Sequence, residues 1–253
     1  FASLRSPQGK NGNYSEVPVT HLGGYYSGRA FMGDIAEVLV FNRALNLAEI
    51  RVVENHLSAK YAIPLAAGAN FYAGDDPAKG DYDLDVFGVG RVDAANKLLE
   101  AGAAGFGFQA VDGSLGDGEF LMAGHKKPTN AWVSTDLPAG SGIRLRWDRV
   151  WYVDATGTTD ALFAFGFTDG GLSPQTLQPA EYYALLYSPT NAFQFSVLAA
   201  GQWNGPDQIF FTLSASQIQD GYYTLGIAVP EPASLVLLVL GAVGLLLVRR
   251  RLA

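Results

Sequence analysis

Short runs of hydrophobic residues recur between residues 81 and 228, roughly every 10–15 positions, with Gly, Pro and Asp in the gaps. In several runs apolar side chains alternate with polar ones, as Ile143, Leu145 and Trp147 do with the residues between them. A period of two is typical of a strand that buries one face. Because no long helical pattern separates the runs, we expect an antiparallel β-sandwich. The predicted strands cover residues 106–111, 119–123, 131–135, 143–153, 161–167, 182–187, 193–198, 208–213 and 222–228.

A different pattern marks residues 25–64. Residues 35–41 are largely apolar or β-branched and predict a strand. A helix is expected next, because Asn46 can cap its first turn, Glu49 stands three residues further on, and Pro64 ends it. Apolar residues then repeat at three- and four-residue spacing along one predicted helix face, namely Ile50, Val53, Leu57 and Tyr61.

The C-terminus carries a third pattern. Residues 233–248 contain no charge and are followed by Arg249, Arg250 and Arg251. As a helix this segment would be about 24 Å long, against ~30 Å of bilayer hydrocarbon, and arginines that reach the interface can make up the difference. We therefore expect a short transmembrane helix with these arginines as a cytoplasmic membrane stop. The alternative is a buried C-terminal helix of a soluble domain.

Composition excludes several classes of protein. A hydrophobic content of 49% against 16% charged residues excludes a disordered chain. The absence of cysteine from all 253 residues excludes a disulfide framework, a thiolate metal site and a cysteine nucleophile. The formal charge is −7, and residues 1–230, with 14 of the 17 basic and 23 of the 24 acidic residues, carry −9. We therefore expect no nucleic acid partner.

The order of residues at the C-terminus is more specific than its composition. The sequence Val229-Pro230-Glu231-Pro232, followed by the apolar stretch and the three arginines, resembles the PEP-CTERM sorting signal of Gram-negative bacteria. The resemblance implies that Pro230, Glu231 and Pro232 are recognised by exosortase, a membrane-embedded cysteine protease or transpeptidase. Two prolines keep the backbone extended and unpaired, which makes it accessible to a protease. The alternative is that the prolines only end a helix or act as a spacer.

Two further resemblances concern the rest of the chain. The runs GDIAEVLVFNRAL and VENHLSAKY within residues 33–61 resemble the last strand and trailing helix of laminin-G-like, concanavalin A-like jelly-roll domains in bacterial surface proteins. The carbohydrate groove of that family lies on earlier strands and cannot be mapped onto this chain. Residues 86–91 and 118–125 resemble an uncharacterised β-rich module that often follows such domains, which implies an architecture and a location but no activity.

These features predict a division of the chain. We expect the C-terminal part of a truncated jelly roll with its helix over residues 1–64, a linker over 65–80, a β-sandwich module over 81–228 and the sorting signal over 229–253. Residues 1–30 are polar and Gly-rich, without the basic and apolar regions of a signal peptide. Because an exported protein needs a signal peptide, we expect this chain to be the C-terminal part of a longer polypeptide.

One acidic run offers candidate metal ligands. Asp81, Asp83 and Asp85 have the spacing of a calcium loop, but Val86 and Val92 stand where an EF-hand has Gly and Glu. Carboxylate oxygens at alternate positions can converge on one ion, so a looser Ca²⁺ site is one interpretation and a solvated acidic linker is the other. We expect no other cofactor.

No residue is assigned a catalytic role. His21, His56 and His125 are far apart in sequence and lack metal-ligand spacing. Neither a Gly-x-Ser-x-Gly elbow nor the E-x-D-x-x-E motif of jelly-roll glucanases is present. The sequence GVG at residues 88–90 lacks the third glycine of a dinucleotide loop and predicts a tight turn. Four tryptophans could fill the core or stack against sugar rings, namely Trp132, Trp147, Trp151 and Trp203.

Together these observations predict a non-enzymatic, exported protein of a Gram-negative bacterium. We expect it to be anchored first in the inner membrane with most of the chain in the periplasm, and then, after exosortase has acted, to reach the cell surface or the extracellular matrix. An alternative is a carbohydrate-binding module that holds extracellular polysaccharide. A third hypothesis is the non-catalytic C-terminal part of a secreted hydrolase.

Overall fold

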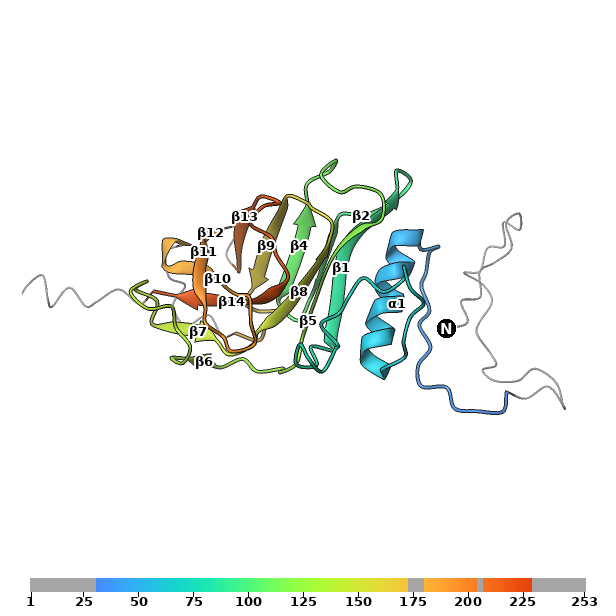
Figure 1. Cartoon of the computed structure of the whole chain (residues 1–253), viewed down its shortest axis with the longest axis horizontal. Coiled ribbons are helices and arrows are strands. Elements are labelled where there is room, and N and C mark those ends of the chain that lie inside the picture. Colours follow the sequence, from blue (N-terminus) through green and yellow to red (C-terminus); the bar gives the residue numbers. More distant parts are fainter. Residues whose placement is uncertain (1–30, 173–179, 204–206, 229–253) are drawn as a thin grey trace, which may run out of the picture. The chain divides into compact units, whose positions relative to one another are not determined.

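The computed structural model describes residues 31–172, 180–203 and 207–228 (Figure 1). Contacts divide the chain into two compact units, Phe1–Asn46 and Leu47–Ala253. The described part of the first unit contains no helix or strand. All the helices and strands of the described chain belong to the second unit.

The second unit is mainly β, as predicted, with two antiparallel sheets. The nine-stranded sheet consists of β1 (Leu84–Asp93), β2 (Asn96–Leu98), β5 (Glu119–His125), β6 (Trp132–Val133), β7 (Leu145–Trp147), β8 (Trp151–Thr156), β10 (Tyr183–Ser188), β11 (Ser196–Ala200) and β14 (Gly221–Ile227). Its order is β11-β10-β14-β8-β5-β1-β2, with β7 paired to β14 and β6 to β7. The five-stranded sheet has the order β12-β13-β9-β4-β3. Its strands are β3 (Glu100–Ala103), β4 (Phe106–Ala110), β9 (Ala161–Gly166), β12 (Gln202–Trp203) and β13 (Gln208–Leu213).

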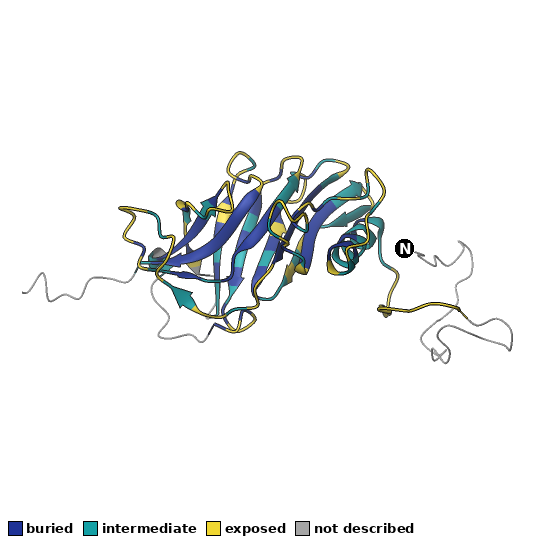
Figure 2. Cartoon of the chain, turned by 60° about the horizontal axis from the view of Figure 1, so that its bottom comes forward, coloured by how far each residue is buried: buried dark blue, intermediate teal, exposed yellow. Residues whose placement is uncertain are grey.

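The main hydrophobic core lies between the two sheets. Phe106 and Phe108 of β4 and Phe163 and Phe165 of β9 are at most 2% exposed, and the Phe106 ring packs against Trp151 of the facing sheet. Stacked and edge-to-face ring pairs hold this layer together, with the Phe106 and Phe165 ring centroids 4.7 Å apart. The residues of β9 alternate between buried and partly exposed, as the predicted period of two requires. Across the sandwich, buried residues lie mainly on the strands and exposed residues mainly in the loops (Figure 2).

The nine-stranded sheet has a second hydrophobic cluster on its outer face. Phe120 and Met122 of β5, Tyr152 of β8 and Tyr222 of β14 form part of it. All seven residues of β14 and six of the seven of β5 are buried. Strands that are buried on both faces carry continuous apolar runs, which explains why these two sequences alternate so little.

One helix and the segment after it cover this second cluster. Helix α1 (Leu47–Tyr61) packs against β1 and β2 (Figure 1). In residues 62–83, Tyr72 and Tyr82 pack against the Tyr152 ring, and the Tyr72 hydroxyl donates a hydrogen bond to the Tyr82 carbonyl over 2.6 Å. Residues 65–80, which we predicted to be a linker, therefore contain a residue, Tyr72, that is packed into the second hydrophobic cluster.

The ends of α1 agree with the prediction, but its buried face does not. The helix begins directly after Asn46, as the expected cap requires, and ends before Pro64. The residues that it buries are Ala48, Asn55, Ser58 and Ala59, whereas the apolar residues of the predicted face are only half-buried. Small and polar side chains let the helix backbone approach the sheet closely. The periodicity of apolar residues does not predict that such side chains form the buried face.

The predicted fold class requires a correction. We expected a transmembrane helix over residues 233–248, but along the described ranges of the chain no helix combines the length and apolar composition that crossing a bilayer requires. Residues 233–248 themselves lie outside the described residues. The strand expected over residues 35–41 is also absent, and Ile35, Val38 and Val40 are exposed.

The GVG sequence at residues 88–90 lies in the middle of β1, not in a turn. A Cβ atom at Gly88 would lie 2.6 Å from the Leu121 carbonyl oxygen, and one at Gly90 would lie 2.1 Å from the Phe120 ring. These glycines therefore allow β5 and its Phe120 ring to approach β1 closely.

Candidate functional site

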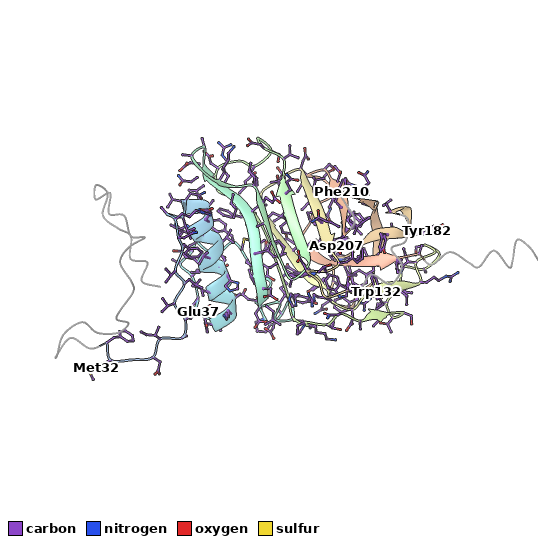
Figure 3. The ribbon with its side chains drawn as sticks, turned by 180° about the vertical axis from the view of Figure 1, so that it is seen from behind. Met32, Glu37, Trp132, Tyr182, Asp207 and Phe210 are labelled. Atoms are coloured by element: carbon purple, nitrogen blue, oxygen red, sulfur yellow. The ribbon has the colours of Figure 1, made fainter. Side chains whose placement is uncertain are left out.

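The outer face of the five-stranded sheet carries a groove of about 800 Å³. Its floor is a row of directly paired residues without large side chains, Gly102 of β3, Gly107 of β4 and Ala164 of β9. Phe210 of β13 continues the row and is labelled in Figure 3. Large aromatic residues point from the same strands into the core, so small residues on the alternate positions leave the outer face hollow.

The groove is rimmed by hydrogen-bonding side chains. Glu100, Gln109, Gln208 and Asp169 line it, and no Lys or Arg is among the described residues around it. The half-buried Phe210 ring offers an apolar face of the kind that stacks against a sugar ring. The volume lies within the usual range for ligand sites, and the residues suit an uncharged, hydroxyl-rich ligand. The groove was not predicted from the sequence, although Gly or Ala at five of the six positions 102–107, and on both sides of Phe165, was a signal for it.

A smaller pocket of about 290 Å³, called here the Tyr82 pocket, lies at the nine-stranded sheet. Its lining comes from five separate connections between elements and, through Arg146, from β7, so sequence spacing gave no signal for it. The residues around it are Tyr82, Lys126, Lys127, Thr135, Asp136, Arg146, Asp148, Val150 and Phe193.

The two histidines that the structure describes, His56 and His125, each contact a residue of β1. His125 is fully buried; its Nε2 lies 2.8 Å from Asp85 Oδ2 and its Nδ1 3.1 Å from the Lys127 carbonyl oxygen. Burial lowers the pKa of His125, and the hydrogen bond to Asp85 opposes that shift. His56 on α1 contacts the Val86 carbonyl oxygen through Nδ1 at 3.0 Å. His21 lies outside the described residues.

The predicted calcium ligands do not converge. Among the residues that the structure describes, no group of three or more His, Asp or Glu side chains is arranged to hold a metal ion. Asp85 instead contacts His125. Asp81 and Asp83 lie near Asp75, whose pKa is raised by burial and further by the neighbouring carboxylates.

The tryptophans whose side chains are described fill or border the core. Trp147 and Trp151 are fully buried in the core, where Trp147 Nε1 donates a hydrogen bond to the Thr129 carbonyl over 2.8 Å. Trp132 is half-buried at the edge of that core. The side chain of Trp203 lies outside the description. Of the three tryptophans whose side chains are described, none lines the groove or the Tyr82 pocket.

The sorting residues predicted at the C-terminus, Pro230, Glu231 and Pro232, lie outside the described residues, as do the three terminal arginines. What the structure describes is the point where the sandwich ends. The Ala228 amide donates a hydrogen bond to the Tyr182 carbonyl over 2.7 Å, directly before the predicted sorting segment. β14, which leads into it, is paired on both sides, with β10 and β8.

Comparison with known proteins identifies the C-terminal segment. Residues 228–251 match the family model for the PEP-CTERM protein-sorting motif. No curated protein and no solved structure is detectably similar to the chain. The laminin-G-like resemblance of residues 33–61 therefore stays a prediction. The motif supports an exported protein that is sorted and processed by exosortase, with membrane-associated sorting before processing.

Proposed function

We propose that this is a non-enzymatic exported protein whose β-sandwich is delivered to the cell surface or extracellular matrix after exosortase acts near Pro230-Glu231-Pro232. The observation that carries the proposal is the sorting-motif match over residues 228–251. The acidic formal charge of −9 over residues 1–230 suits a soluble surface component.

The end of the sandwich supports this order of events. The Arg144 amide donates to the Ile227 carbonyl over 2.9 Å, and the Ala228 amide donates to Tyr182, so the backbone is fixed up to the first residue of the motif. A protease needs extended, unpaired backbone, and Pro230 and Pro232 cannot donate to a strand ladder. Processing after Ala228 would therefore leave every strand of the described sandwich paired.

Replacement of Pro230 and Pro232 by alanine in the native host tests the proposal. We expect the double variant to keep its C-terminal segment and to accumulate in the membrane fraction, as the unaltered protein should in a strain without exosortase. Pro128→Ala with Pro189→Ala, two exposed positions in the sandwich, is the matched control. Intact mass of the protein from each fraction is the measurement. Normal removal of the segment from the Pro230/Pro232 variant would refute the proposal.

A second candidate function is binding of an uncharged polysaccharide in the groove of the five-stranded sheet. It is favoured by the aromatic Phe210 beside a floor of Gly and Ala and by the amide and carboxylate side chains at the rim. A glycan array with the complete chain is the direct experiment. Phe210→Ala should abolish the signal, whereas Val111→Ala, at another exposed apolar position, should not. An array without any bound glycan, or equal signals from both variants, would exclude this function.

A further inference from the structure

We propose that the Tyr82 pocket binds a monosaccharide unit that carries a carboxylate, such as a uronate residue of an acidic polysaccharide. This inference goes beyond the sorting function and does not depend on the groove, because the pocket lies at the other sheet. A volume of about 290 Å³ is at the lower end for ligand sites and suits a single sugar ring.

The pocket has a buried polar group without a partner. Tyr82 is fully buried, and its hydroxyl has no hydrogen-bond partner among the described residues. Tyr82 and Arg146 both line the pocket, and burial raises the pKa of the Tyr82 hydroxyl. A buried hydroxyl without a partner is less favourable than one that is hydrogen-bonded. A ligand hydroxyl or carboxylate in the pocket would supply that partner.

The charge of the pocket is opposite to that of the chain. Lys126, Lys127 and Arg146 face two carboxylates, Asp136 and Asp148, which leaves one excess positive charge on a protein of net charge −7. Neither lysine takes part in an ion pair with any of the residues described. The Lys126 ammonium lies 5.2 Å from the centre of the Tyr82 ring, so this lysine covers the ring and is positioned to meet an anion there.

Arg146 has a different role, because its guanidinium is already occupied. Its Nε donates to the Thr135 carbonyl over 3.0 Å, its Nη1 to the Trp147 carbonyl over 3.0 Å and its Nη2 to Asp136 Oδ2 over 2.9 Å. These bonds fix the wall that contains Asp136, so Arg146 positions the pocket while the two lysines remain available for a carboxylate.

The remaining lining suits the rest of a sugar. Asp148 and the Thr135 hydroxyl can bind sugar hydroxyls, and Phe193 and Val150 give an apolar surface for C–H groups. Phe193 has a φ of 51° and Asp136 a φ of 57°. A left-handed backbone is rare for a bulky residue such as Phe193 and is retained where the surrounding structure holds it, often at binding sites.

Titration of the full chain with sodium glucuronate, followed by calorimetry or NMR, tests the inference. For one sugar unit we expect saturable binding with a Kd of about 1 mM and at least a 10-fold weaker interaction with glucose. Lys126→Gln with Lys127→Gln should weaken glucuronate binding about 10-fold or more. Lys97→Gln, at a lysine that pairs with Asp112 away from the pocket, is the control and should leave the Kd unchanged.

Tyr82→Phe separates binding from folding. Because the lost hydroxyl has no partner, the variant should unfold at the same temperature as the unaltered protein or higher, yet bind glucuronate several-fold more weakly. Absence of saturable binding would overturn the inference. Equal affinity for glucose would overturn the inference that the ligand carries a carboxylate. Equal affinity for acetate or phosphate would show a general anion site instead of a sugar site. An unchanged Kd in both the lysine and the tyrosine variants would place the ligand elsewhere.

Discussion

Asp154 combines burial with a negative charge on the outer face of β8. Its Oδ2 accepts a hydrogen bond of 2.6 Å from the Ala73 amide, which ties residues 62–83 to the sheet. Burial raises the pKa of Asp154 to about 6; the Ala73 hydrogen bond and Lys79 oppose this, and Asp220 adds to it. The folded protein therefore holds a proton on this carboxyl at pH values where the unfolded chain does not.

The sign of the resulting pH dependence follows from linkage. Between about pH 4 and pH 6 the folded state binds more protons at Asp154 than the unfolded state, so the contribution of this residue to stability is full below pH 4 and is lost as the pH rises through 6. Asp154→Asn, which keeps an oxygen acceptor for the Ala73 amide, should raise the free energy of unfolding at pH 7 by roughly 1–3 kcal/mol and flatten its slope between pH 4 and pH 6. Urea denaturation over that pH range measures both effects.

A control variant is available for this prediction. Asp169 is exposed on the other sheet, and Asp169→Asn should change neither the stability at pH 7 nor the slope. If Asp154→Asn and the unaltered protein showed the same stability and the same slope, Asp154 would ionise as freely in the folded state as in the unfolded chain, and its burial would carry no electrostatic cost.

At the scale of elements, α1 is attached through a buried polar residue. Asn55 is 1% exposed; its Nδ2 donates to the Arg51 and Ala69 carbonyls over 2.8 and 2.9 Å, and its Oδ1 accepts the Phe71 amide over 2.8 Å. One side chain therefore joins the helix to the segment that follows it. Removal of the side chain would leave backbone groups at Ala69 and Phe71 without these partners.

Asn55→Ala should lower the free energy of unfolding by roughly 2–4 kcal/mol and increase proteolytic cleavage within residues 62–83 under native conditions. Arg51→Ala is the matched control, because it removes only the ion pair with Glu54 at the helix surface and should cost at most about 1 kcal/mol. Urea denaturation and limited proteolysis are the measurements. Equal losses in the two variants would mean that Asn55 does not join the two elements.

Sequence periodicity predicted the elements that bury one face or stand between clear turn signals. β9 and β13 were predicted nearly to their ends, because large apolar residues recur at every second position, as Phe163 and Phe165 do in β9 and Ile209 and Phe211 in β13. β1 was missed because Gly88 and Gly90 suggested a turn, while in the folded protein they make room for Met122 and Phe120. Residues 35–41 have the composition of a strand but no strand partner among the described residues. Composition does not supply a partner, and a strand needs one.

The groove and the Tyr82 pocket differ in how far they could be predicted from the sequence. The groove depends on Gly102, Gly107 and Ala164, which lie side by side on neighbouring strands. Their position follows from the sequence once the pairing of these strands is known. The Tyr82 pocket depends on side chains from connections that meet only in the folded chain, for example Tyr82 before β1 and Phe193 after β10. The spacing of residues along the sequence does not predict that these connections lie together in the fold. The sorting motif, in contrast, is contiguous and was found from sequence alone.

At the scale of the whole molecule, both hydrophobic clusters are formed by residues between Ala48 and Ala228. The division of contacts falls between Asn46 and Leu47, so α1 belongs to the same unit as the sheets. This differs from the expected boundary after residue 64, which would assign α1 to a preceding jelly roll. The difference follows from packing, because Ala48 and Ala59 of the helix share a cluster with residues of β1 and β5.

Two truncations distinguish these boundaries. A chain of residues 47–228 should unfold in one cooperative transition within a few degrees of the melting temperature of the full chain, because it retains both clusters. A chain of residues 65–228 should be strongly destabilised, because it loses the α1 residues of the second cluster and uncovers the face of β1 and β2 against which α1 packs. At about 1.5–3 kcal/mol for each large side chain exposed, that loss is comparable with the whole stability of a domain. Equal melting temperatures for the two truncations would show instead that α1 contributes nothing to this unit and that the boundary lies after residue 64.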